Sequence, residues 1–216
     1  MKNVTIIGAS GYVGSALLQE TLKRDYQVKA IVRHPEKINI ENNHLQIIKG
    51  NVTDIDEVYQ LLNGSETVIS AYNPGWQDPH IYDDIVKGYQ AIIEGSKRAG
   101  VKRLLITGGA GRLYIAPGIR LVDSGEIPPQ LLNGVKGQVE VYTKLLLPEK
   151  EIDWVFLSPS AILVPGQRTG HFRIGKDDLI TDENGESRIS IEDFAVAMLN
   201  ELETPKHHRQ GSTVGY

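Results

Sequence analysis

The chain has 216 residues, a formal net charge of −4 and no cysteine. Its length suffices for one well-cored domain, and no linker, low-complexity tract or internal repeat divides it, so we expect a single domain over residues 1–216. The interspersed acidic and basic residues argue against nucleic acid as a partner, and the missing cysteines exclude disulfides, thiolate catalysis and cysteine-ligated metals.

The first predicted elements are a strand over Val4–Ile7 and a helix over about residues 10–24. Between them, Gly8, Gly11 and Gly14 stand at a spacing of three, with an alanine where the common glycine pattern has its second glycine. A strand that ends in such a turn and leads into a helix is typical of a dinucleotide-binding unit, because the helix N-terminus then faces the pyrophosphate. The stretch therefore predicts a phosphate-binding turn, with an ordinary strand–helix turn as the alternative.

A second strand is predicted over Gln27–Val32, and it ends at Arg33 and His34. In dinucleotide-binding units a carboxylate about 20 residues after the glycines accepts a hydrogen bond from the ribose 2′-OH, whereas an arginine accommodates a 2′-phosphate. Arg33 stands at this position without an acidic residue, which favours NADP(H) over NAD(H). The alternative is that Arg33 is a solvated charge at the end of the strand.

The rest of the chain continues to alternate strands with helices. Strands are expected over Leu45–Lys49, Thr67–Ala71, Arg103–Ile106 and Asp153–Leu157, and helices over about residues 55–62, 79–99, 131–147 and from Ser190 onward. Residues 113–129 and 165–188 are predicted to be irregular, and Ser212–Gly215 to add a short edge strand. This rhythm predicts an α/β Rossmann fold, a doubly wound parallel sheet with strand order 3-2-1-4-5-6.

Several short motifs together resemble one known family. They are the glycine turn and residues 32–37, 50–54, 108–111, 157–160, 165–170 and 187–190. They are similar to the atypical short-chain dehydrogenase/reductases, and within them to the bacterial branch named NADH-flavin reductases, which is related to NmrA-like proteins and to biliverdin-IXβ/flavin reductase. The resemblance spans essentially the whole chain and implies a Rossmann fold and an NAD(P)H-dependent reductase.

The resemblance also implies which residues bind the cofactor. The pyrophosphate would be held by Gly8, Ala9, Ser10, Gly11, Tyr12 and Val13, and the adenosine ribose phosphate by Arg33 with His34 beside it. The adenine would lie at Asn51 and Val52, the backbone path past the cofactor at Ala71 and Tyr72, the nicotinamide near Thr107 and Gly108, and its carboxamide against Pro159 and Ser160.

The better-known members of that superfamily pair a tyrosine with a lysine four residues later, and the lysine lowers the tyrosine pKa for acid–base work. None of the nine tyrosines here has this partner; Tyr142, the natural candidate by position, is followed at that spacing by Leu146. Carbonyl reduction and sugar epimerisation need a positioned proton donor or base, whereas hydride transfer to a flavin or quinone can take its proton from solvent. The missing pair therefore favours a small planar acceptor.

Four side chains are candidates for orienting or stacking on the acceptor beside the nicotinamide. Thr107 and Lys136 are candidate catalytic residues that would orient the acceptor, although a solvated helix lysine is the plainer interpretation of Lys136. Tyr72 and Trp76 follow a strand end and could stack on a flat acceptor, or pack locally.

Two segments are expected to form the acceptor side of the site, about residues 112–130 and 160–190. Within the second, the run Pro165–Gly170 is expected to close over the carboxyl edge of the sheet, and Arg168 to meet an anionic group on the acceptor. Such a loop would hold the reactants together and keep water away. The alternative is a surface connection with no catalytic part.

The remaining expectations concern metals, location and alternative functions. The six histidines show no spacing suited to joint ligation, so no metal site is expected. No apolar run approaches the ~20 residues of a membrane helix, and the early first strand leaves no room for a signal peptide, which predicts a cytoplasmic protein. The sequence leaves open whether it is a monomer or a homodimer. The sequence leaves open a non-catalytic, NADP(H)-sensing regulatory protein of the NmrA-like kind, and disfavours a sugar epimerase.

Overall fold

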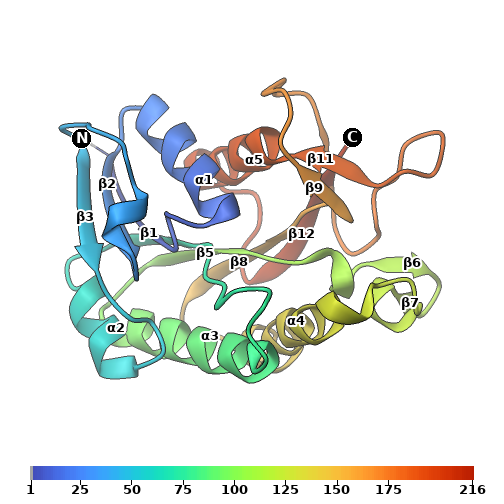
Figure 1. Cartoon of the computed structure of the whole chain (residues 1–216), viewed down its shortest axis with the longest axis horizontal. Helices are drawn as coiled ribbons and strands as arrows, with labels where there is room; N and C mark the ends of the chain where they lie inside the picture. Colours follow the sequence, from blue (N-terminus) through green and yellow to red (C-terminus); the bar gives the residue numbers. More distant parts are fainter. Residues whose placement is uncertain (1) are drawn as a thin grey trace.

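The computed structural model describes residues 2–216 and is built on one eight-stranded sheet, with strand order β10-β12-β8-β5-β4-β1-β2-β3 (Figure 1). The strands of this sheet are β1 Asn3–Ile7, β2 Gln27–Val32, β3 Leu45–Lys49, β4 Thr67–Ser70, β5 Arg103–Thr107, β8 Asp153–Ser158, β10 Arg173–Gly175 and β12 Gln210–Gly215. All of them run parallel except β10, which pairs antiparallel with β12. The predicted order 3-2-1-4-5-6 is confirmed, with β8 as the sixth strand.

In the described residues 2–216, five α-helices cover the two faces of the sheet. They are α1 Tyr12–Lys23, α2 Ile55–Leu62, α3 Ile81–Arg98, α4 Pro129–Glu140 and α5 Ile191–Glu203. Helices α1 and α5 pack together on one face, and α2, α3 and α4 line the other (Figure 1). This is the doubly wound arrangement in which ligands bind beyond the carboxyl ends of the strands.

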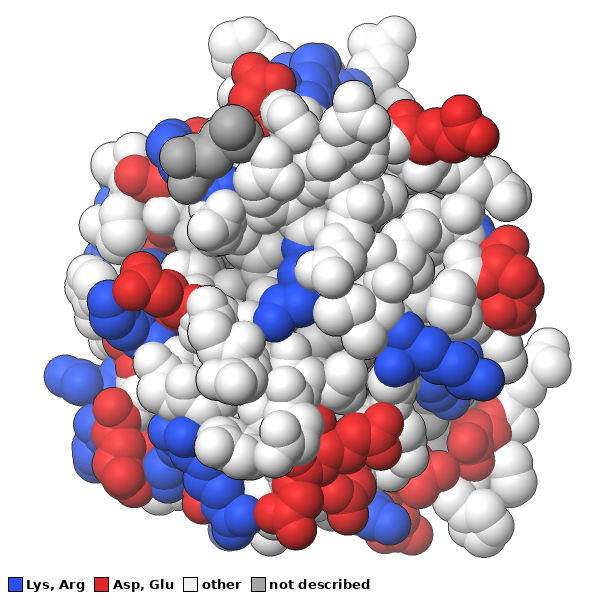
Figure 2. Space-filling view, turned by 90° about the vertical axis from the view of Figure 1, so that its left-hand side faces the viewer, with Lys and Arg blue, Asp and Glu red and all other residues white. Residues whose placement is uncertain are grey.

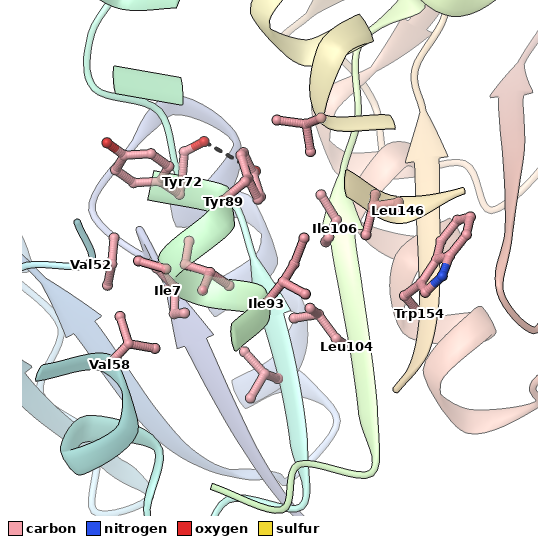
Figure 3. Close-up of a cluster of buried hydrophobic side chains, with 14 of the residues drawn as sticks. Ile7, Val52, Val58, Tyr72, Tyr89, Ile93, Leu104, Ile106, Leu146 and Trp154 are labelled. Carbon is pink, nitrogen blue, oxygen red and sulfur yellow. Dashed lines mark hydrogen bonds between the residues drawn. The ribbon is translucent and has the colours of Figure 1, made fainter. Parts of the chain in front are cut away.

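The apolar runs of the strands are explained by burial on both faces. In β5, Leu104 and Ile106 belong to the core on the α3 side, whereas Leu105 belongs to the core on the α1 side. Figure 3 shows the α3-side core, where Tyr72 and Tyr89 lie at one end. The Tyr89 hydroxyl and the Tyr72 carbonyl form a polar contact at the edge of this otherwise apolar core.

Three predicted segments differ from the structure. Residues 165–188 contain β10 and lead into β11 (Arg188–Ser190), which pairs with β9 (Ile162–Val164), and residues 113–129 contain the hairpin of β6 (Tyr114–Ala116) and β7 (Ile119–Arg120). These strands have two or three residues, too few to show an alternating pattern. The C-terminal strand β12 has six residues and lies inside the sheet, because β10 covers its outer side.

The predicted helix over 131–147 begins two residues earlier, at Pro129, and changes at Val141–Leu146 into a π-helical turn. A proline is favoured in the first turn of a helix, where its missing N–H has no intrahelical partner in any case. The helix therefore begins at the end of the segment 113–129, which was predicted to be irregular.

Charged side chains of both signs are mixed on the face of the molecule shown in Figure 2, around a largely uncharged centre. No stripe of one sign crosses this face. Among the helices of residues 2–216, none combines the length and apolar character needed to cross a membrane.

Candidate cofactor-binding site

The turn between β1 and α1 is built on two glycines that exclude any side chain. Gly8 has φ +80°, and a Cβ there would lie 2.7 Å from the carbonyl oxygen of Ala71. A Cβ on Gly14 would lie 2.0 Å from the carbonyl oxygen of Gly8. The turn closes through a hydrogen bond of 2.9 Å from the Gly11 N–H to the Gly8 carbonyl. The sequence needs glycine here because the chain folds back on itself and on the end of β4.

Gly11 plays a different part, because the space beside it is open. A Cβ on Gly11 would approach only the Gly8 carbonyl oxygen, at 3.3 Å, and its φ of −80° suits any residue. The first turn of α1 has no side-chain cap and no acidic residue, whereas Asp54 caps α2 and Ser190 caps α5. An uncapped helix N-terminus behind an exposed glycine is suited to a phosphate group.

Arg33 lies at the same edge of the sheet and reaches across it. Its Nη2 donates to the carbonyl oxygens of Asn73 and Pro74, at 3.3 and 3.0 Å. Since β1 separates β2 from β4 in the sheet, the guanidinium spans the edge beside the glycine turn. Next to it, the exposed Nδ1 of His34 lies 3.0 Å from Oε1 of Glu36. The interpretation of Arg33 as a purely solvated charge is therefore not supported.

At the end of β3 the two implied adenine contacts behave differently. The side-chain oxygen of Asn51 accepts hydrogen bonds from the backbone N–H and the hydroxyl of Thr53, at 3.3 and 3.1 Å. The Val52 side chain is buried in the α3-side core. Only the backbone of Val52 is therefore placed to meet a ligand.

Tyr72 does not stack on an acceptor, and that hypothesis is wrong. Its ring is buried against Gly88 of α3, and its hydroxyl donates to the Asp84 carbonyl at 3.1 Å. Burial raises the pKa of Tyr72 to about 12. Trp76 is 49% exposed and packs against Gly134 of α4, so local packing is present and stacking on an acceptor stays a prediction.

The candidates at the end of β5 are only partly brought together. The buried hydroxyl of Thr107 donates to the Ser70 carbonyl at 2.6 Å, and the Gly108 N–H donates to the Leu157 carbonyl at 2.8 Å, so both tie neighbouring strand ends together. Lys136 is exposed, whereas Gln138 of the same helix is buried. At about 100° per residue the two point to nearly opposite sides of α4. Lys136 therefore faces away from the sheet, which favours its interpretation as a solvated helix lysine.

The segment after β8 also differs from the expectation. Pro159 and Ser160 are buried, and the Ser160 hydroxyl donates to the Val214 carbonyl of β12 at 3.1 Å. A Cβ on Gly215 would lie 2.4 Å from that hydroxyl oxygen. The Ser160 side chain thus fixes β12 to the end of β8, and only backbone atoms remain for a carboxamide.

The run Pro165–Gly170 is held to the N-terminus of α5 and does not form a free lid. The fully buried carboxylate of Asp193 accepts from the Thr169 hydroxyl at 2.5 Å and from the Gly170 N–H at 2.7 Å. The Ser190 hydroxyl donates to the Gln167 carbonyl at 2.9 Å. These three hydrogen bonds hold the loop against the first turn of α5.

Sequence reasoning missed a polar pair in the core. Tyr89 of α3 is completely buried, and its hydroxyl donates to the Tyr72 carbonyl at 3.2 Å (Figure 3). Its phenol oxygen also interacts with the side chains of Ser70 and Gln138. The available signal was a glutamine on the inward side of α4, between Gly137 and Val141, where an apolar residue is the rule.

Two other features lie away from this edge. A hollow of about 690 Å³ opens at the amino ends of β1 to β4, opposite the glycine turn. In the described residues no group of three or more His, Asp or Glu side chains could hold a metal ion. The glycine turn and Arg33 therefore form the candidate cofactor site, since they lie where ligands bind in doubly wound sheets.

Comparison with known proteins shows the family to which the chain belongs. A family model described as NAD(P)H-binding matches residues 8–202. A solved structure from Bacteroides thetaiotaomicron, described as a candidate epimerase, is 56% identical, covers 100% of this chain and 97% of its own, and has a TM-score of 0.95. A candidate exported protein from Burkholderia pseudomallei is 36% identical, with 100% of both chains covered and a TM-score of 0.88.

A candidate NADH-flavin reductase from Streptococcus pneumoniae is 28% identical, covers 100% of this chain and 99% of its own, and has a TM-score of 0.84. The names of these relatives differ in the reaction, but all share the fold over the full chain. The family match begins at Gly8, the first glycine of the phosphate-binding turn. The chain belongs to the NAD(P)H-binding family of Rossmann-fold oxidoreductases, in its atypical short-chain dehydrogenase/reductase and flavin reductase-like branch.

Proposed function

We propose that this protein is an NADPH-preferring reductase that passes hydride to a small planar acceptor such as a flavin or a quinone. The observation that carries the proposal is the open glycine turn at the uncapped start of α1, with the Arg33 guanidinium beside it. The helix N-terminus suits the pyrophosphate, and the arginine suits a 2′-phosphate. Bound NADPH supplies the hydride, and the protein supplies binding and position.

The choice of acceptor rests on the missing acid–base pair. No tyrosine is followed by lysine at the fourth position, and the Tyr142 hydroxyl lies beside Gly211, the second residue of β12. Gly211 pairs with Phe156 near the carboxyl end of β8, so Tyr142 is set apart from a proton-transfer tyrosine by the missing lysine and not by its position. Without a tyrosine–lysine pair, an acceptor that takes its proton from solvent is favoured over a carbonyl or a sugar.

We place the acceptor beside the segments 112–130 and 160–190. The Tyr114 N–H donates to the Asp177 carbonyl at 2.7 Å, and the Leu179 N–H donates to the Tyr114 carbonyl at 2.9 Å, so the two segments form one body. Ile115 and Ile119 of the hairpin and Ile162 of β9 are partly exposed there. Exposed apolar side chains of this kind suit a flat, apolar ring system. We propose the cytoplasm as the location of the protein.

The experiment is steady-state oxidation of NADPH, followed by the loss of its absorbance, with FMN, riboflavin and a soluble quinone offered separately. Turnover with at least one acceptor, and slower turnover with NADH at equal concentration, is the expected result. Binding of NADPH without turnover on any acceptor would favour the cofactor-sensing NmrA-like alternative. Absence of NADPH binding would reject the proposal.

The name of the Bacteroides relative makes an epimerase worth a separate arm of the same assay. An epimerase of this fold oxidises the sugar with NAD(P)⁺ and then returns the hydride, so incubation with a nucleotide sugar and NADP⁺ would interconvert the sugar without net change in the cofactor. Such interconversion would replace the proposed reaction, whereas we expect none.

A further inference from the structure

Gln138 of α4 has a side-chain oxygen whose hydrogen-bonding capacity is unused. The residue is 9% exposed, and its Oε1 is buried without a hydrogen-bond partner among residues 2–216. Most buried polar atoms in folded proteins are paired, so an unpaired amide oxygen calls for an explanation. The proposed function above gives Gln138 no role.

The orientation of the Gln138 amide follows from its neighbour Tyr89. The Tyr89 hydroxyl donates its only proton to the Tyr72 carbonyl, and burial raises the pKa of Tyr89 so that the proton stays in place. The Tyr89 oxygen can therefore only accept a hydrogen bond from Gln138, which must present its NH₂ group. The amide oxygen of Gln138 is thereby turned away from Tyr89.

Gln138 lies at the part of the sheet edge that the nicotinamide half of the cofactor is expected to occupy. A Cβ on Gly109, two residues beyond β5, would lie 3.7 Å from the Gln138 Cβ and 3.9 Å from its Cγ. A dinucleotide lies across the point where the strand order reverses, here between β1 and β4. With Arg33 on the β2 side for the adenosine half, the nicotinamide half extends over β4 and β5.

We propose that Oε1 of Gln138 accepts a hydrogen bond from the nicotinamide half of NADP(H), either from a hydroxyl of its ribose or from its carboxamide NH₂. Gln138 is thus a binding and positioning residue of α4, the helix whose Lys136 faces away from the sheet. The Tyr89–Gln138 contact holds the acceptor atom in one orientation before the ligand arrives, which reduces the entropy lost on binding. The inference rests on the proposed function, because it needs NADP(H) in the site.

The test compares two ligands by isothermal titration calorimetry: NADPH, and adenosine 2′,5′-bisphosphate, which lacks the nicotinamide half. Gln138→Met removes the amide with little change in size. Gly109→Ala adds a methyl group at ordinary contact distance, at a backbone conformation (φ −118°) that alanine adopts readily, and it narrows the space beside Gln138. Gln130→Met, an exposed glutamine in the first turn of the same helix, is the matched control.

We expect Gln138→Met to weaken NADPH binding about 3- to 10-fold, the usual effect of one neutral hydrogen bond. Gly109→Ala should also weaken NADPH, both variants should leave adenosine 2′,5′-bisphosphate binding unchanged, and Gln130→Met should change neither. Unchanged NADPH affinity in Gln138→Met would overturn the inference, and so would an equal loss for both ligands, which would mark a purely structural role. Failure of the wild type to bind NADPH would instead reject the proposed function itself.

Discussion

Arg168, in the loop after β9, holds Glu20 of α1 through two parallel hydrogen bonds, Nε to Oε2 and Nη2 to Oε1, both 2.8 Å long. The Glu20 side chain is 5% exposed and is also bonded by Arg24 at 2.7 Å. Since α1 starts at the glycine turn, Glu20 lies two turns down the helix from the cofactor edge. Arg168 therefore fixes its loop to α1 and does not meet an anionic group on the acceptor, which corrects the sequence-based expectation.

This ion pair predicts a pH-dependent loss of stability in Arg168→Ala. Burial raises the pKa of Glu20, but Arg168 and Arg24 outweigh it, so the pKa lies below the ordinary 4.5. A lowered carboxyl pKa stabilises the fold above pH 4.5, and this contribution is lost as the pH falls through the lowered value. We expect Arg168→Ala to cost about 1–2 kcal/mol at pH 7, since Arg24 remains and Arg168 is partly exposed.

Urea unfolding of wild type and Arg168→Ala, at pH 7 and at several values below pH 4.5, measures this effect. The difference between the two proteins should shrink toward the acid end. Arg98→Ala, which removes a surface pair with Asp56, is the control and should cost no more than about 0.5 kcal/mol. A difference that stays constant with pH would show that Glu20 is not the charge involved.

Arg33→Ala should abolish the preference for NADP(H) over NAD(H). A charge-assisted hydrogen bond to the 2′-phosphate contributes about 1.5–3 kcal/mol, which corresponds to roughly 10- to 150-fold in affinity. The affinity for NAD(H) should change little, because it carries no phosphate at that position. Titration of both cofactors into both proteins checks this, and equal affinities in the wild type would refute the assignment of Arg33.

Gly11→Val should lose NADPH binding and keep the fold. The added Cβ would lie 3.3 Å from the Gly8 carbonyl oxygen, a contact much longer than those at Gly8 and Gly14, so we expect the main cost to fall on the pyrophosphate. Gly8→Val is the informative contrast, because its φ of +80° and the Ala71 carbonyl at 2.7 Å should destabilise the protein itself. Circular dichroism with thermal melts, alongside NADPH titration, separates the two effects. Retained binding in folded Gly11→Val would place the phosphate site elsewhere.

The sequence predicted those parts of the molecule that local pattern determines. The rhythm of strands and helices gave the sheet order, and glycine spacing located the turn that Gly8 and Gly14 close. The antiparallel pairing of β10 with β12 was not predictable, since it joins Ile174 to Val214 across 40 residues and β10 has no pattern of its own. For the same reason the sequence predicted that Tyr72 lies at the edge of the sheet, but not that its ring is buried. The ring fits into the core because Gly88 of α3 has no side chain there.

The geometry of Tyr142 bears directly on whether the protein uses a proton-transfer tyrosine. Its ring packs against Phe156 with centroids 5.2 Å apart, and the Arg112 guanidinium lies 4.6 Å above it. Burial raises the pKa of Tyr142 despite this nearby cation, and the hydroxyl is bonded to the backbone of Gly211 near the amino end of β12. The group is therefore protonated at neutral pH and has no lysine at the fourth position to lower its pKa.

Tyr142→Phe should accordingly keep its reductase turnover within a few-fold of wild type. The phenylalanine ring preserves the contacts with Phe156 and Arg112, so the loss is one hydrogen bond, about 1 kcal/mol of stability. A general acid–base residue typically supplies 10²- to 10⁴-fold in rate. Turnover of both proteins with one acceptor, measured below the melting temperature of the variant, decides the matter. A drop in turnover on that scale, with unchanged NADPH affinity, would mean that Tyr142 delivers a proton. The proposal that the acceptor takes its proton from solvent would then be wrong.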